Sequence, residues 1–161
     1  MDNARFTARR TTRTYRQTIN STPEKVFPLL CPVREAEWLD GWKCAMIYSE
    51  SGLIETGAVF STAHEGEEDT VWIVTKHDPG KQEIEFARFT PGSRTCVLRI
   101  AVRAKAENRS YVDISYTYTA LTPAGNDFID GLTEEAFVEG VVFWEKSVNY
   151  FLETGNKLNR A

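Results

Sequence analysis

Hydrophobic and polar residues alternate with a period of two along most of the chain, which is the pattern of half-buried β-strands. The alternation is clearest over residues 94–106 and 110–122. One face of the first segment carries Cys96, Leu98, Ile100, Val102 and Ala104, and one face of the second carries Val112, Ile114, Tyr116 and Tyr118. Further strands are predicted over 12–20, 43–50, 57–65, 69–77 and 82–90. The short connections, rich in turn-forming residues, predict that the last six strands form an antiparallel meander.

Three segments have the patterns of helices instead. A Thr-Pro-Glu sequence at 22–24 begins a short helix that ends at Pro32, and a second short helix is expected over 33–39. Thr133 caps a long third helix that opens with two glutamates. Its apolar stripe, about six turns long, needs the sheet as its partner. The stripe consists of Phe137, Val141, Trp144, Val148, Phe151 and Leu158.

The resulting order is one strand, two short helices, six strands and a long helix, which predicts an α+β fold. The 161 residues, of which 42% are hydrophobic, fit a single domain spanning 1–161 with a flexible tail over 1–11. Apolar runs are far shorter than the roughly 20 residues of a membrane-spanning helix. Residues 1–18 contain no apolar run either, which predicts no secretory signal.

Charge and cysteine usage narrow the setting further. The first sixteen residues hold five arginines and one aspartate, whereas the whole chain has a net charge of −4. An Arg-rich start is typical of a transit peptide, a nucleic-acid-binding arm or a plain tail leading into a strand. We expect no nucleic-acid partner, because the acidic remainder would repel a phosphate backbone. Cys31, Cys44 and Cys96 are scattered and odd in number, which favours reduced thiols and a cytoplasmic location.

Common catalytic and metal-binding motifs are absent. The sequence has no GxSxG, GxxxxGK[ST], GxGxxG or HExxH segment. Its two histidines, His64 and His77, fall in different predicted strands, and no pair of histidines or cysteines has the spacing of metal ligands. We therefore expect neither a metal nor a cofactor.

Two segments at the ends of the sheet carry a family resemblance. They are residues 19–27, Ile-Asn-Ser-Thr-Pro-Glu-Lys-Val-Phe, and residues 119–125, Thr-Ala-Leu-Thr-Pro-Ala-Gly. With the order of elements from about Thr12 to Gly155, they resemble the helix-grip fold of the START-related SRPBCC superfamily, which includes lipid-transfer domains, polyketide cyclases and homologues of chaperone ATPase activators. The resemblance implies a curved antiparallel sheet of about seven strands wrapped around the long helix, with a cavity between them. It carries over no catalytic residue, because the superfamily shares none.

Arg88 is the most informative candidate for that cavity. It shares strand parity with Ile84 and Phe86, so it should point inward, where an unpaired charge is costly. It would then clamp a ligand carboxylate or enolate, unless it extends to solvent or pairs with a carboxylate such as Glu37. His64 shares parity with Phe60, and it either faces the cavity as a general base or is simply exposed.

Aromatic residues supply the other candidate ligand contacts. Tyr116 and Tyr118 lie on the covered face of their strand, where a ligand or water would meet their hydroxyl groups. Trp38 and Trp42 flank Gly41 and are either lid residues at the cavity mouth or an aromatic plug. The remaining tryptophans are expected to face each other from sheet and helix, either as core or as ligand contacts. They are Trp72 and Trp144.

Three functions are compatible with these observations. The first is a soluble protein that binds a hydrophobic or amphipathic small molecule between sheet and helix, and a cavity below about 100 Å³ would argue against it. The second is a cyclase- or dehydratase-like enzyme on a polyketide-type substrate, which requires Arg88, His64 and Tyr116 to converge on one point. The third is a chaperone-partner module, which an exposed patch containing Trp38 and Trp42 would favour. A homodimer is left open.

Overall fold

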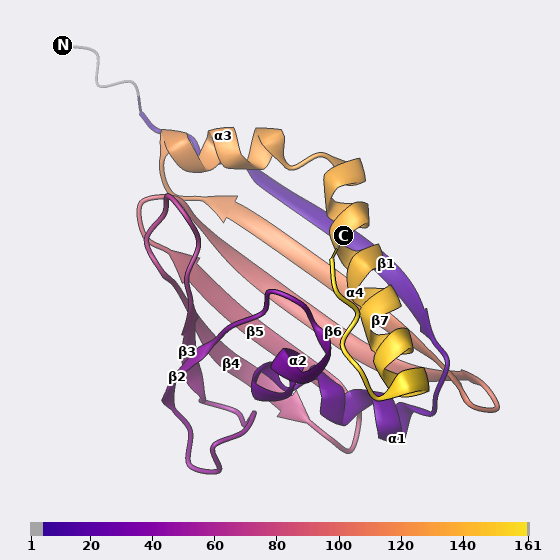
Figure 1. The fold of residues 1–161 in the computed structure, drawn as a ribbon. Helices are drawn as coiled ribbons and strands as arrows, with labels where there is room; N and C mark the ends of the chain where they lie inside the picture. The colour runs from indigo at the N-terminus through magenta and orange to yellow at the C-terminus, as the bar shows by residue number, and fades with distance from the viewer. Residues whose placement is uncertain (1–4, 161) are drawn as a thin grey trace.

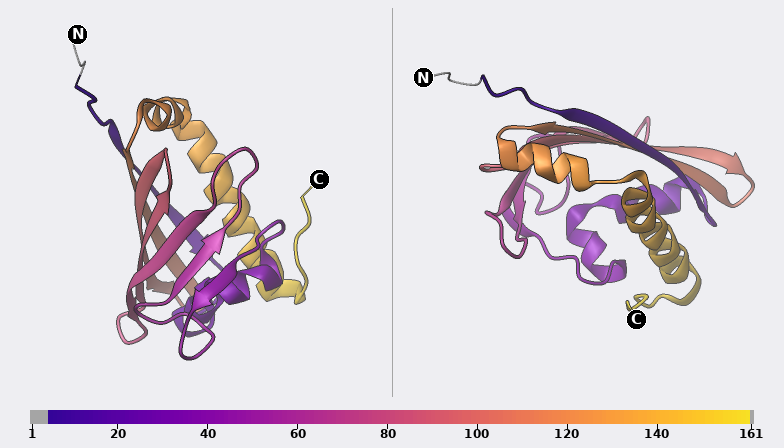
Figure 2. Two further views of the ribbon diagram at one scale, coloured as in Figure 1. Left: turned by 90° about the vertical axis from the view of Figure 1, so that its left-hand side faces the viewer. Right: turned by 90° about the horizontal axis from the view of Figure 1, so that it is seen from above.

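The structure is a computed structural model that describes residues 5–160. A seven-stranded antiparallel sheet curves around a long C-terminal helix, as Figures 1 and 2 show. The strands are β1 (Arg10–Ile19), β2 (Ala45–Tyr48), β3 (Val59–Thr62), β4 (Thr70–Asp78), β5 (Glu83–Thr90), β6 (Arg94–Ala106) and β7 (Arg109–Ala120). Their order in the sheet is β1-β7-β6-β5-β4-β3-β2, so the last six form the predicted meander and β1 returns to pair with β7. The predicted α+β helix-grip fold is thereby confirmed.

The helices lie in the concave side of the sheet (Figure 2). They are α1 (Pro23–Val26), a 3₁₀ turn (Phe27–Leu30), α2 (Pro32–Trp38), α3 (Pro123–Gly131) and α4 (Glu134–Thr154). Thr133 caps α4 as predicted, because its hydroxyl oxygen accepts a hydrogen bond from the Ala136 N–H at 3.1 Å. Thr22 begins α1 without a side-chain cap, and Pro23 in the first turn favours the helix there. No helix of the described residues is long and apolar enough to span a membrane.

Two predictions at the C-terminal end were wrong. The stretch 123–131 forms a helix of its own, α3, which Thr122 caps. Helix α4 stops at Thr154, because Gly155 adopts a left-handed conformation with φ of 73°. Leu158 is therefore not part of the helical stripe. It forms an isolated β-bridge with Leu39, which lies next to α2.

Edge strand β1 holds α4 in place. The side chain of Gln17 is buried, and its amide N–H donates to the Val141 carbonyl at 2.9 Å. The Thr18 N–H donates to the Glu145 carboxylate at 2.6 Å. The arginines of the N-terminal segment are likewise used within the fold, since Arg16 pairs with Asp113 and Arg9 with Asp130. The strand that begins at Arg10 also shortens the predicted flexible tail.

Aromatic rings fill most of the space between sheet and helices. Trp72 stacks on Phe60 at 5.2 Å between ring centroids and meets Phe86 edge to face at 5.6 Å. Trp144 of α4 stacks on Trp38 of α2, with their ring planes 7° apart. Trp38 is fully buried and donates its indole N–H to the Leu29 carbonyl at 2.8 Å. The core is therefore mostly packed, and the space left for a ligand is restricted to one end of α4.

Candidate functional site

The register of the central strands sets four polar or aromatic side chains in one row across the inner face of the sheet. Trp72 of β4 pairs with Arg88 of β5, Arg88 with Cys96 of β6, and Cys96 with Tyr118 of β7. Because neighbours across an antiparallel pair point to the same face, these side chains lie side by side. The row places the predicted inward arginine between two aromatic rings.

Arg88 is half-buried among aromatic rings. Its guanidinium carbon lies 4.8 Å from the centre of the Trp72 ring, 5.3 Å from Tyr116 and 5.4 Å from Tyr118. One of its nitrogens donates to the Tyr118 hydroxyl at 2.7 Å. Arg88 forms no ion pair with any described residue, and Glu37, its suggested partner, pairs with Arg34 instead at 3.0 Å. The guanidinium is thus oriented by ring faces and a phenol rather than neutralised.

An open groove of about 300 Å³ lies next to Arg88, between the sheet and α4. Its lining residues include Arg88, Tyr116, Tyr118, Phe137, Gly140, Phe143, Trp144 and Arg160. The groove exists because Ala136 and Gly140, one helical turn apart, present almost no side chain toward the sheet. A Cβ atom added at Gly140 would meet no atom within 4 Å. Small residues on one face of α4 therefore leave the space that larger residues fill further along the helix.

The segment after α4 closes one side of this groove. The Leu39–Leu158 bridge anchors it, and the Arg160 N–H donates to the Asp40 carboxylate at 3.0 Å. The Arg160 guanidinium lies 4.3 Å from the centre of the Phe143 ring. The chain thus returns across α4, beside α2 (Figure 1), and brings a second arginine to the groove wall.

A small, partly open cavity adjoins the groove. It measures about 70 Å³ and shares Leu39, Tyr116 and Trp144 with the groove wall. Its volume is below the roughly 100 Å³ at which we expected the binding hypothesis to fail, since drug-sized ligands occupy about 300 Å³ or more, so by itself it argues against a bound ligand. Only the adjoining groove, of about 300 Å³, reaches the necessary size. A ligand would therefore lie mainly in the open groove and insert only one end into the cavity.

Two polar groups of this cavity lack partners. The indole N–H of Trp144 is buried and has no hydrogen-bond acceptor, although the residue is only 8% exposed. The Glu35 carboxyl lines the cavity, and neither an ion pair nor a side-chain hydrogen bond of Glu35 occurs among the described residues. Burial raises the pKa of Glu35 to about 8, which makes a neutral carboxylic acid the dominant form at pH 7. Burial also raises the pKa of Tyr116 above its ordinary range, so that hydroxyl stays protonated.

Glu35 was not among the predicted site residues. A signal was nevertheless present. Glu35 is three residues before Trp38 in α2, so the two face the same side of the helix. Since Trp38 is buried, that face is the covered one.

The predicted ligand contacts divide into two groups. Those that line the groove or the cavity are Arg88, Tyr116, Tyr118, Trp42, Trp72 and Trp144. Trp72 and Trp144 both line the small cavity, but the ring of Trp144 stacks on Trp38 and that of Trp72 on Phe60. Two others lie elsewhere. Trp38 is a core residue, and His64 is exposed in a turn because strand β3 ends at Thr62 before the alternation reaches it.

These placements bear on the alternatives set out above. His64 lines neither the groove nor the cavity, so Arg88, His64 and Tyr116 do not converge and the cyclase-like hypothesis fails in the form that requires all three. A surface patch containing both Trp38 and Trp42 does not exist, because Trp38 is 0% exposed. No group of three or more potential metal ligands occurs among residues 5–160.

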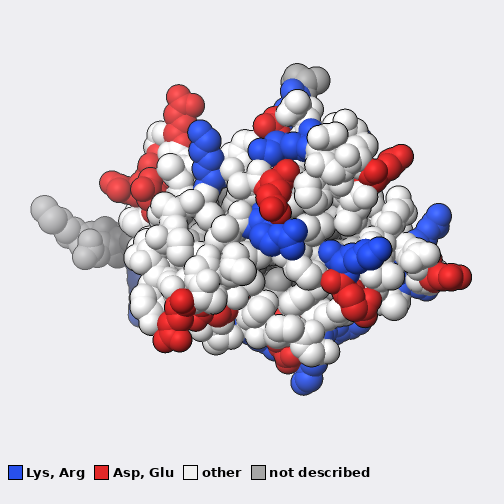
Figure 3. Space-filling view, turned by 60° about the horizontal axis from the view of Figure 1, so that its bottom comes forward, with Lys and Arg blue, Asp and Glu red and all other residues white. Residues whose placement is uncertain are grey.

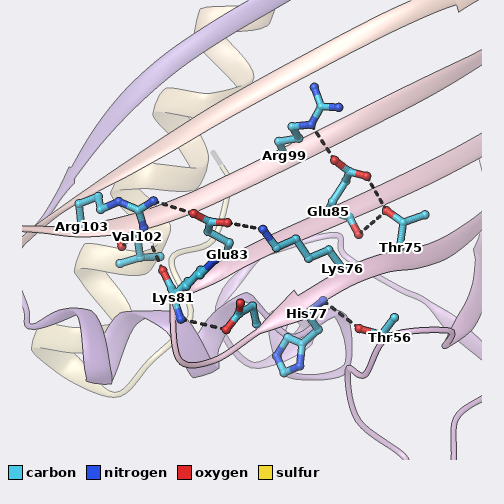
Figure 4. A network of polar contacts seen from close by, with 11 residues as sticks. Thr56, Thr75, Lys76, His77, Lys81, Glu83, Glu85, Arg99, Val102 and Arg103 are labelled. Carbon is cyan, nitrogen blue, oxygen red and sulfur yellow. Dashed lines mark hydrogen bonds and ion pairs between the residues drawn. The ribbon is translucent and has the colours of Figure 1, made fainter.

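A larger hollow, of about 740 Å³, lies on the opposite face of the sheet. Its charged side chains neutralise one another, as Figure 4 shows for Glu83 between Lys76 and Arg103 and for Glu85 beside Arg99. The face displayed in Figure 3 likewise has interspersed acidic and basic side chains rather than a patch of one sign. The charged side chains of the outer hollow are therefore paired with one another, whereas the groove beside α4 contains hydrogen-bond donors without partners.

A curved sheet, a C-terminal helix lying in its concave side and a groove between them define a helix-grip fold. No protein-family model and no curated protein sequence matches the chain. Solved structures match its fold. Norcoclaurine synthase from Thalictrum flavum, in complex with dopamine and hydroxybenzaldehyde, is 11% identical with a TM-score of 0.67, and the match covers 91% of this chain and 88% of that one.

Two further structures give the same result. The Helicobacter pylori protein jhp0584 is 9% identical with a TM-score of 0.71, covering 88% of this chain and 87% of that one. Ara h 8.0201 is 13% identical with a TM-score of 0.63, covering 91% of this chain and 100% of that one. At such low identity these matches establish the fold alone.

Proposed function

We propose that the protein binds an amphipathic small molecule in the groove between α4 and the inner face of the sheet. The observation that carries this proposal is the coincidence of an aromatic wall, an unneutralised Arg88 and an unpartnered Trp144 N–H in one groove. A ligand that covers the rings and accepts hydrogen bonds would satisfy all three. The presence of two aromatic compounds in the norcoclaurine synthase structure supports the capacity of this fold for such ligands.

A groove-filling substitution tests the proposal. Gly140→Leu adds a side chain where the groove is open, and leucine favours a helix more than glycine does, so the variant should fold. Gly131→Leu is the matched control, because Gly131 lies in α3, away from the groove, and also has open space around it.

Titration with a fluorescent fatty acid, together with native mass spectrometry of gently purified protein, supplies the measurement. We expect saturable binding to the unaltered protein and to Gly131→Leu, and at least tenfold weaker binding to Gly140→Leu. Equal affinity of Gly140→Leu and the unaltered protein would place the ligand elsewhere and contradict the proposal.

A second candidate function is catalysis on a polyketide-type ketone, and Glu35 is the observation that favours it. At pH 7 a minor fraction of Glu35 is ionised, and this carboxylate, which lines the cavity with Tyr116, would take the α-proton of a bound ketone while Arg88 stabilises the enolate. The carboxylic acid so formed exchanges its proton with solvent and returns one to the α-carbon. Hydrogen–deuterium exchange at the α-carbon of 4-phenylbutan-2-one, followed by NMR, tests this candidate. Catalysed exchange that is lost in Glu35→Gln would support it, and exchange at the uncatalysed rate would argue against it.

A further inference from the structure

The groove beside α4 is lined by two arginines and, among the described residues, by no carboxylate. This composition is unusual for a chain with a net charge of −4. Most other described arginines near acids are paired, through the ion pairs Arg9–Asp130, Arg16–Asp113, Arg34–Glu37, Arg94–Glu67, Arg99–Glu85 and Arg103–Glu83. Arg88 and Arg160 appear in none of these pairs; Arg5, Arg10, Arg13 and Arg109 do not either, but these four do not line the groove. The groove therefore contains two arginines without a carboxylate partner, even though the protein as a whole is acidic.

The internal contacts of Arg88 leave most of its hydrogen-bonding capacity unused. A guanidinium has five N–H donors, and Arg88 uses one of them on the Tyr118 hydroxyl and faces the Cys96 thiol, a weak acceptor, with another. Ring faces attract its charge but accept no strong hydrogen bond, so cation–π contacts do not replace an anion. A carboxylate would take two parallel N–H donors from such a planar group. Arg88 is thus held in place by its neighbours with its remaining donors free for an external partner.

The second arginine approaches the groove from the C-terminal segment. Its backbone is tied to Asp40, and its guanidinium covers Phe143 without a carboxylate partner among the described residues. Because Arg88 comes from β5 and Arg160 from beyond α4, the two charges enter the groove from different elements. An anion between them would meet donors from both sides.

The remaining polar groups are also donors. The Trp144 indole can only donate, and it is buried at the junction of groove and cavity without an acceptor. Glu35, neutral at pH 7, adds a carboxylic acid O–H rather than a negative charge. A ligand for this wall must therefore supply acceptors.

From two arginines and an indole N–H that can only donate, we infer that the ligand is an aromatic carboxylate. Its carboxylate lies between Arg88 and Arg160, its ring lies against Tyr116 and Phe137, and an acceptor atom reaches the Trp144 N–H. The inference rests on the proposed binding function and specifies the chemical class of the ligand. A cationic ligand would find no compensating charge in the groove.

Isothermal titration calorimetry at pH 7 with three probes of similar shape tests the inference. The probes are 2-naphthylacetate, its neutral amide 2-naphthylacetamide, and the cation 2-(2-naphthyl)ethylammonium. We expect the carboxylate to bind at least tenfold more tightly than the amide and the ammonium compound to bind most weakly. Arg88→Gln should reduce the carboxylate's advantage to less than threefold, and Arg160→Gln should reduce it by a smaller factor. Arg99→Gln, on the outer face of the sheet, should leave it unchanged.

The outcomes separate the inference from the proposed function. Equal binding of carboxylate and amide, with both weakened by Gly140→Leu, would overturn the aromatic-carboxylate inference and leave the groove as the binding site. Preferential binding of the ammonium compound would overturn it as well. Failure of all three probes to bind at millimolar concentration would contradict both the inference and the proposed function.

Discussion

Replacing Glu35 with glutamine should change the pH dependence of folding, because the carboxyl group lines a small cavity and has no ion-pair partner among the described residues. Burial raises the pKa of Glu35 to about 8 from an ordinary value of 4.5. Between these two values the unfolded chain releases the proton while the folded chain retains it. The folded state therefore binds more protons than the unfolded state, and stability falls as pH rises through this window.

The size of the effect follows from the same two pKa values. Each pKa unit corresponds to about 1.4 kcal/mol, so the full difference would disfavour the folded state by at most about 5 kcal/mol above pH 8. Glu35 as a residue is partly exposed, so this figure is an upper bound. We expect about 4 kcal/mol, which keeps the carboxyl group neutral at pH 7. Glutamine has nearly the same shape and no charge, so Glu35→Gln should remove the penalty.

Urea denaturation at pH 5, 7 and 9 measures the effect. The free energy of unfolding of Glu35→Gln relative to the unaltered protein should rise with pH and level off near pH 9, by about 4 kcal/mol in total. Glu37→Gln is the matched control, since Glu37 lies on the same helix, is exposed and pairs with Arg34. A stability difference that is the same at all three pH values would refute the assignment of a buried, neutral Glu35.

Two other predictions test the packing of the fold. Gly125→Ala should destabilise the protein by about 3 kcal/mol in urea denaturation, because a Cβ atom there would lie 1.9 Å from the Ser93 carbonyl oxygen. The control Gly131→Ala, whose Cβ atom would meet no atom within 4 Å, should leave the free energy of unfolding unchanged. Equal effects of the two substitutions would contradict the packing of α3. Cys96 should not react with a thiol reagent at pH 8 in the native protein, because it is 1% exposed and burial raises the pKa of its thiol. Cys44, which is only partly buried, should react first, and early labelling of Cys96 would contradict the closed core.

Much of the fold was predictable because its signals are local. Period-two alternation and turn residues lie within each strand and loop, so the six strands of the meander end within three residues of their predicted limits. The ends of α4 show both the success and the limit of such signals. Thr133 caps the helix through its own neighbours, whereas Leu158 continues the apolar spacing but follows Gly155, whose positive φ turns the chain away. Where Leu158 then packs depends on Leu39, more than a hundred residues earlier.

The candidate site was predictable only in part. Strand parity sufficed for Arg88, because a regular strand fixes which side each residue faces. Parity misled for His64, because β3 ends two residues before it. The volume of the cavity could not follow from a pattern at all, since it depends on how Trp72, Phe60 and Phe86 pack together in three dimensions. Likewise, only the folded structure shows that Arg88 has no ion-pair partner among the described residues.

The indole N–H signals of the four tryptophans offer the most direct test of a ligand in the groove. Trp144 is unpartnered at the junction of groove and cavity, whereas Trp38 already donates to the Leu29 carbonyl. In ¹H–¹⁵N correlation spectra recorded during titration with 2-naphthylacetate, we predict that the Trp144 indole signal shifts and saturates while the Trp38 signal stays in place. An unchanged Trp144 signal, with backbone shifts confined to the outer hollow around Arg99 and Glu85, would contradict the account.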